Sequence, residues 1–392
     1  MAVPSTRARR RIFDSSRHLG TLNMPICRLP PVGIRVASRP HGHDVANSHA
    51  EESMNSTKSR RIRISSVVLL LLALGARPAE PARKPLPATV DQLLSLPAPP
   101  FAIGHRGFGD NLGEDPSRPI ENSVPAVRRG FAAGVSVVEV DVQLTKDGKV
   151  AVFHDDFLSD FTCINRLTLA ELQARQPRVP SLQAVLDQSR RFNQSSGPLR
   201  GLVIVELKAA APLCDPDDIQ DRAIVSAVTS VIVRLGMTRQ VMLTSFSPAL
   251  LYLAAIEAPE MTRILAISGL QFLTAAEIEE RLGLPVTLID KRLALGLQWA
   301  DVGSIFRLPG YQSVADVVST ATIASVHVVE ADIFFLSSAG APFVETLHEL
   351  GLKAFGFTAD DPAEWVFLES LGLDGIYAND IPFAVAHQAP IP

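Results

Sequence analysis

The residues best suited to chemistry are two histidines that each end a short apolar run. His105 and Arg106 stand between two glycines directly after the apolar run 101–103, and His154 follows another such run. An imidazole titrates near neutral pH and a guanidinium binds anions, so the pair of residues 105 and 106 indicates a site for an anionic ligand. A single histidine at such a place is more often a packed or surface residue. Two of them beside an anion can divide the roles of general base and general acid.

Three carboxylates are candidates for holding a cation. Glu139 and Asp141 lie two residues apart in an apolar run, so a β-strand would present both on one face. Glu206 ends a further apolar run. An all-oxygen set suits Mg²⁺ or Ca²⁺ better than zinc. We therefore predict a divalent metal, Ca²⁺ or Mg²⁺, at these three residues; the alternative is a buried ion network with Arg106 or Lys208.

The combined set favours phosphoryl transfer. Arg106 and Lys208 can neutralise phosphate oxygens while one histidine activates the attacking oxygen and the other protonates the leaving alkoxide. A diester is the natural substrate, because its poor leaving group gains most from a positioned acid. The chain has no GKT-type phosphate loop of the kind that nucleotide sites use.

From residue 101 onward, apolar β-branched runs alternate with amphipathic stretches, which is typical of βα units and a parallel sheet. We predict an α/β fold: a single-domain, distorted TIM (β/α)8 barrel, since the polar residues fall where strands end. The candidate strands are 101–105, 137–142, 150–154, 202–207, 240–245, 262–267, 323–329, 352–357 and 375–378. Nine candidates exceed eight places, and we expect 262–267 or 323–329 to be peripheral. The predicted helices are 123–133, with Ser123 as cap, and 181–193, 217–235, 248–257, 340–350 and 361–371; the stretch 270–320 is left unassigned.

The first hundred residues differ from the rest. We expect residues 1–53 to be disordered or non-native, with Met54 as the true start, and residues 54–76 to form a signal peptide. Its apolar run of about eleven residues is short of the ~20 that span a bilayer, so no stable membrane span is expected; an uncleaved interfacial helix is the alternative. Residues 77–100, rich in Pro and Ala, would be a linker or a wrap onto the barrel, and 101–385 the catalytic barrel. The expected location is exported, either periplasmic or secreted.

The expected export affects the state of the cysteines, and the composition limits the possible binding partners. Cleavage would remove Cys27 and leave Cys163 and Cys214 in an oxidising compartment, where a disulfide over the site is a hypothesis against two separate thiols. A net charge of -4 and the lack of a basic stripe argue against nucleic acid as a partner. The expected partner is a small-molecule substrate; the oligomeric state is left open.

The ordered motifs resemble those of the glycerophosphodiester phosphodiesterase family, phospholipase C-like TIM barrels, over about 101–382. They are Gly104-His105-Arg106-Gly107, Glu121-Asn122, Glu139-Val140-Asp141, His154-Asp155, Glu206-Leu207-Lys208, Ser245-Phe246 and Asp374-Gly375-Ile376. The resemblance implies hydrolysis of glycerophosphodiesters to sn-glycerol 3-phosphate and an alcohol. It further implies these roles: His105 and His154 as the acid/base pair, Glu139, Asp141 and Glu206 as metal ligands, Arg106 and Lys208 on phosphate, and Glu121 orienting the first-strand residues.

Some positions depart from the family pattern. The loop 108–120 is long, and Phe357 stands where the family often has Trp, which keeps an aromatic wall but removes a donor. The closing motif is one residue longer, so either Asn379 or Asp380 can take the usual place. An apolar rim from Phe357, Phe335 and Leu336 would favour a lysophospholipase D-type reaction instead. A non-catalytic periplasmic binding protein is the alternative from another class, and the intact set of catalytic residues argues against it.

Overall fold

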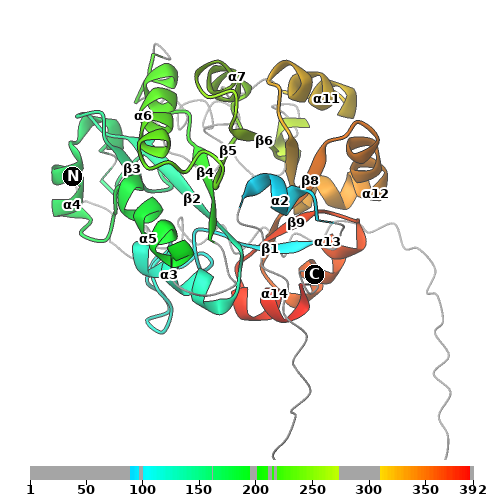
Figure 1. The fold of residues 1–392 in the computed structure, drawn as a ribbon, viewed down its shortest axis with the longest axis horizontal. Coiled ribbons are helices and arrows are strands. Elements are labelled where there is room, and N and C mark those ends of the chain that lie inside the picture. The colour runs from blue at the N-terminus through cyan, green and yellow to red at the C-terminus, as the bar shows by residue number, and fades with distance from the viewer. Residues whose placement is uncertain are drawn as a thin grey trace, which may run out of the picture. The chain divides into compact units, whose positions relative to one another are not determined.

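The computed structural model describes residues 89–96, 100–160, 162–194, 201–210, 214–215, 219–272 and 310–388. The strands in these parts are β1 (Phe101–Gly104), β2 (Val137–Leu144), β3 (Val150–Val152), β4 (Leu202–Leu207), β5 (Val241–Ser245), β6 (Thr262–Ile267), β7 (Val328–Asp332), β8 (Lys353–Ala359) and β9 (Gly375–Ala378). They follow the order β1-β9-β8-β7-β6-β5-β4-β2-β3, and pairing of β1 with β2 closes eight parallel strands into a barrel ringed by helices (Figure 1). The predicted TIM (β/α)8 barrel is confirmed.

The extra strand is β3, so the expectation that 262–267 or 323–329 lies outside the barrel is wrong. β3 pairs antiparallel with β2, with Val142 opposite Val152. Only residues 145–149 join the two strands, and a parallel crossover needs a dozen residues or more. β6 and β7 are barrel strands, each paired in parallel with both of its neighbours. The strand predicted at 323–329 begins at Val328 instead, because a helix occupies the residues up to Ile323.

Helices cover the outside of the barrel. The main ones are α3 (Val124–Ala133), α4 (Leu169–Arg175), α5 (Leu182–Gln194), α6 (Asp221–Arg234), α7 (Pro248–Glu257), α11 (Val314–Ile323), α12 (Ile333–Glu349), α13 (Pro362–Ser370) and α14 (Ile381–His387). Ser123 caps α3 as predicted, accepting the N–H of Ala126 at 3.2 Å. The predicted helix 340–350 is the second part of α12, which is interrupted at Gly340, where φ is +65°. Helices α4, α11 and α14 were not predicted.

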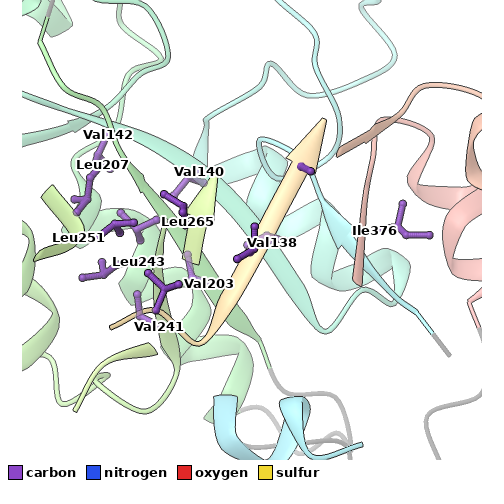
Figure 2. Close-up of a cluster of buried hydrophobic side chains, with 14 of the residues drawn as sticks. Val138, Val140, Val142, Val203, Leu207, Val241, Leu243, Leu251, Leu265 and Ile376 are labelled. Carbon is purple, nitrogen blue, oxygen red and sulfur yellow. The ribbon is translucent and has the colours of Figure 1, made fainter. Parts of the chain in front are cut away.

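The core lies between the strands and the helices. The outward-facing residues of β2, Val138, Val140 and Val142, belong to one large cluster with apolar residues of β4, β5, β6 and β9 and with Leu251 of α7 (Figure 2). Strands buried on both faces are expected to be almost continuously apolar. The polar residues of β2 are therefore conspicuous, and they face the barrel interior.

A second cluster fills the bottom of the interior. It contains Ile103, Val137, Ile204, Met242, Ile264, Val328 and Phe355. Helix α2 (Val90–Leu94), which lies in the range predicted as linker or wrap, adds Val90 and Leu93 to this cluster. Residues 1–53 and 54–76 lie outside the described residues. No helix among the described residues has the length and apolarity to cross a bilayer.

Candidate active site

Three acidic side chains meet inside the barrel. Glu139 and Asp141 point inward from β2, and each is 2% exposed. Glu206 comes from β4, where it is the register partner of Asp141. One carboxylate oxygen from each residue lies within 4.8 Å of the other two. The structure thus brings the three predicted ligands together.

Negative charge outweighs positive charge at Glu139. Burial, followed by the charges of Asp141 and Glu206, raises the pKa of Glu139 well above its usual range. Its Oε1 is buried without a hydrogen-bond partner among the described residues. A divalent cation would satisfy this oxygen and relieve the repulsion, and an all-oxygen donor set suits Mg²⁺ or Ca²⁺. The residues therefore fit the implied metal.

Lys208 lies against the same cluster. Its Nζ is 3.0 Å from Asp141 Oδ1 and 2.6 Å from Glu206 Oε1. Burial alone would raise the pKa of Asp141, but Lys208 and His154 hold it well below its usual range. Asn122 also contacts Asp141, donating from Nδ2 to Oδ2 at 2.7 Å and accepting the Asp141 N–H at 3.0 Å. The pKa values of Asp141 and Glu139 are therefore shifted in opposite directions, with the cationic side chains lying against Asp141.

A tight turn after β1 brings Arg106 over the carboxylates. Arg106 has φ of +49°, and the turn is so close that a Cβ on Gly104 would lie 2.6 Å from the carbonyl of Gly107. The Arg106 N–H donates to Glu139 Oε2 at 2.9 Å, and its guanidinium donates to Glu121 Oε1 at 2.8 Å. Burial by itself lowers the pKa of Arg106. The negative charges of Glu121, Asp141 and Glu139 have the larger effect and raise this pKa above its usual value.

His105 is held through its Nδ1 atom, which lies 2.8 Å from Asn379 Oδ1. The orientation of the Asn379 amide is fixed, because Oδ1 also accepts the N–H of Asp110 at 2.9 Å and Nδ2 donates to Asp360 Oδ1 at 2.6 Å. Nδ1 must then carry the hydrogen, which leaves Nε2 as the basic nitrogen. Burial, with a smaller effect of Arg106, lowers the pKa of His105 to about 4.

The sequence left open whether Asn379 or Asp380 takes the family position. The structure separates their roles: Asn379 contacts His105, and Asp380 caps α14 by accepting the N–H of Phe383 at 3.0 Å. Sequence reasoning did not connect Asn379 with His105, because the two are 274 residues apart.

His154 has a charged partner. Its Nδ1 lies 2.7 Å from Asp155 Oδ1. Its loop is held by Gln143, which donates to the carbonyl of His154 at 3.2 Å and to Asp156 Oδ1 at 2.9 Å. Burial raises the pKa of Asp156 to about 7.

The predicted disulfide between Cys163 and Cys214 is present, with the Cα atoms 5.7 Å apart. It joins the loop that carries His154 to the segment that follows Lys208. Phe157 packs against both cysteines, and Asn165 Nδ2 donates to the carbonyl of Cys214 at 2.9 Å.

Aromatic rings also lie at the site. Phe357 lies edge-on to Phe246, at 5.9 Å between ring centroids, and to Tyr377, at 6.0 Å. The lysophospholipase D-type alternative would need Phe335 and Leu336 in an apolar rim, and the structure does not place them there. Both are buried, at 7% and 0% exposed, because they belong to the first turn of α12 and pack into the outer core.

The fold is a (β/α)8 barrel. At the carboxyl ends of its strands lie a cluster of three carboxylates suited to a divalent cation, two histidines and two cationic side chains. The family model described as "Glycerophosphoryl diester phosphodiesterase family" matches residues 105–382. The chain belongs to this family, as its motifs indicated.

Individual relatives match shorter stretches. A glycerophosphocholine phosphodiesterase of Eremothecium gossypii is 42% identical over 59 residues, which are 15% of this chain and 4% of that protein. A glycerophosphodiester phosphodiesterase of Bacillus altitudinis is 41% identical over 60 residues, 15% of this chain and 22% of that protein. The chain thus spans less than a quarter of the length of these two curated relatives.

The fold has solved counterparts. A phosphodiesterase of Oleispira antarctica, solved in complex with the product sn-glycerol-3-phosphate, superposes with a TM-score of 0.51 at 18% identity, covering 74% of this chain and 96% of that one. At this identity the likeness concerns the fold.

Proposed function

We propose that the chain hydrolyses glycerophosphodiesters to sn-glycerol 3-phosphate and an alcohol, with two-histidine acid/base catalysis and a divalent cation. The observation that carries the proposal is that His105 and His154, each with a partner at Nδ1, follow strands of the same sheet that brings the carboxylates of Glu139, Asp141 and Glu206 together. Family membership supports the reaction class. The product complex of the Oleispira phosphodiesterase supports the product.

The Nδ1 partners suggest which histidine is base and which is acid. The Nδ1 of His154 contacts the carboxylate of Asp155, whereas the Nδ1 of His105 contacts the neutral amide of Asn379 and His105 lies beside Arg106. His105 Nε2 would accept the proton of the attacking hydroxyl. His154 Nε2 would give its proton to the departing alkoxide.

The charged residues would bind and orient the phosphate. Arg106 and Lys208 are the cationic side chains that would contact the phosphate oxygens, and Glu121 fixes the guanidinium of Arg106. Glu139, Asp141 and Glu206 would hold Ca²⁺ or Mg²⁺, which supplies charge neutralisation on the phosphate when bound. The aromatic ring of Phe357 would bound the pocket.

A diester without an acyl chain is the favoured substrate. The lysophospholipase D-type alternative needs an apolar rim, and two of its three proposed residues, Phe335 and Leu336, lie in the core. The test offers glycerophosphocholine and lysophosphatidylcholine to the purified chain, separately and in competition. Preferential cleavage of glycerophosphocholine supports the proposal, and preferential cleavage of the lysolipid contradicts it.

We also propose export to the periplasm or the medium, directed by residues 54–76, with 77–100 joining the catalytic barrel of 101–385. The Cys163–Cys214 disulfide supports an oxidising compartment. Mass spectrometry of the chain recovered outside the cytoplasm would show a new N-terminus near residue 76. A chain retained inside with its first residues intact would contradict export.

A further inference from the structure

A fourth buried carboxylate lies inside the barrel, and the reaction proposed above does not use it. Glu330 of β7 is 4% exposed. Thr244 of β5 donates to its Oε1 at 2.6 Å, and the Tyr377 hydroxyl of β9 donates to its Oε2. Glu330 therefore links three strands through two neutral hydroxyl groups.

Glu330 shares the level of the metal cluster in the barrel. On four strands, a polar residue follows by two positions an apolar residue of the bottom cluster. These pairs are Val137 and Glu139, Ile204 and Glu206, Met242 and Thr244, and Val328 and Glu330. Alternation along a strand keeps both members of each pair on the interior face. Glu330 thus comes directly above the apolar bottom layer, as Glu139 and Glu206 do.

The two hydroxyl groups connect Glu330 to the cluster. Thr244 is the register partner of Glu206 in the neighbouring strand. The charges of Glu139 and Glu206 act on the Tyr377 phenol, and together with burial and Glu330 itself they raise its pKa well above the usual range. Thr244 and Tyr377 therefore lie next to Glu330 and also next to the acidic cluster.

This arrangement is unfavourable in the absence of a cation. A buried carboxylate whose hydrogen-bond partners are neutral loses hydration that two hydroxyl donors replace only in part, and the charge of Lys208 offsets this loss incompletely, so that the pKa of Glu330 stays raised. A glutamine or an apolar residue at this position would fold at lower cost. A bound dication reverses the balance, because each further negative charge near it is attractive.

We propose that Glu330 is a positioning residue for the divalent cation: its charge, held by Thr244 and Tyr377, raises the cation affinity of the cluster of Glu139, Asp141 and Glu206. The inference rests on the proposed metal site. It adds a residue that touches neither the cation nor the substrate and that acts through the potential inside the barrel.

The test is calorimetric titration of the full chain with Mg²⁺ alone and Ca²⁺ alone. We expect Glu330→Gln, which keeps the shape and removes the charge, to bind the cation about tenfold more weakly or worse, in the range found when outer partners of a metal site are removed. Glu330→Asp keeps the charge and should retain most of the affinity. Glu349→Gln removes an exposed charge on α12 and serves as the matched control, with affinity unchanged.

A second readout does not depend on turnover. The rise in melting temperature on adding Mg²⁺ at one fixed concentration should be smaller for Glu330→Gln than for the parent. A separate turnover measurement should find that kcat at saturating cation stays near that of the parent. A folded Glu330→Gln chain that binds the cation within twofold of the parent would overturn the role of Glu330 alone. A parent chain that binds neither cation would overturn the metal site, and this inference with it.

Discussion

Removal of the Cys163–Cys214 disulfide should destabilise the barrel and disturb the His154 loop. The cysteines are 51 residues apart in the sequence, and the chain-entropy relation for a closed loop of that size gives about 4 kcal/mol. For a domain of this size that corresponds to a melting temperature lower by roughly 8 °C. Because His154 lies on the loop that the disulfide anchors, kcat should fall more than KM rises.

The assay compares Cys163→Ser/Cys214→Ser with its parent, both carrying Cys27→Ser so that no other thiol contributes. Thermal unfolding and turnover of a glycerophosphodiester are measured with and without reductant. Reduction should lower the melting temperature of the parent to that of the variant. The melting temperature of the variant should not change with reductant. Two free thiols in the denatured, unreduced parent, or equal melting temperatures of parent and variant, would refute the reasoning.

Three further predictions follow from the site. His105→Ala and His154→Ala should each lower kcat by roughly 10²–10⁴-fold while calorimetry finds Mg²⁺ binding retained; variants with near-parental kcat would contradict acid/base roles. Asn379→Leu, which removes the Nδ1 acceptor of His105, should lower kcat by roughly a hundredfold with KM little changed, and equal kcat would mean that the amide does not orient the imidazole. Burial raises the pKa of Glu330 from 4.5 to about 7, so in chelator the parent should lose stability as pH rises through that window. Denaturant unfolding should then find Glu330→Gln more stable than the parent by about 3 kcal/mol at pH 8 and equal to it at pH 4; no difference at pH 8 would contradict a buried, ionising Glu330.

The strand ends carried most of what the sequence could reveal about the site. Glu139 and Asp141 interrupt an apolar run at a spacing of two. This local pattern is enough to predict that both side chains lie on the same face of one strand. The position of Asn379 against His105 depends on closure of β9 onto β1, a contact between distant segments that no local pattern encodes. Glu330 had a local signal, a single acidic residue within the apolar run 328–331, which a search for buried carboxylates would have found.

The errors in the fold prediction have local causes. The extra strand β3 was identifiable from the short connection at residues 145–149, which leaves no room for a crossover helix. Phe335 and Leu336 follow strand β7 closely in the sequence, where residues of the barrel rim are expected. Asp332, the last residue of β7, caps α12 by accepting the N–H of Phe335 at 2.7 Å. The helix therefore begins directly after the strand, and Phe335 and Leu336 pack into the core.

The central claim is that the acidic cluster and the two histidines form a cation-dependent glycerophosphodiesterase. The most direct measurement is release of glycerol 3-phosphate from glycerophosphocholine by the purified chain, first stripped with EDTA and then titrated with Ca²⁺ or Mg²⁺, alongside Glu139→Gln and the exposed-loop control Glu114→Gln. The account predicts no release after EDTA, saturable recovery with a cation in the parent and the control, and none in Glu139→Gln. Release that persists in EDTA, or full recovery in Glu139→Gln, would contradict it.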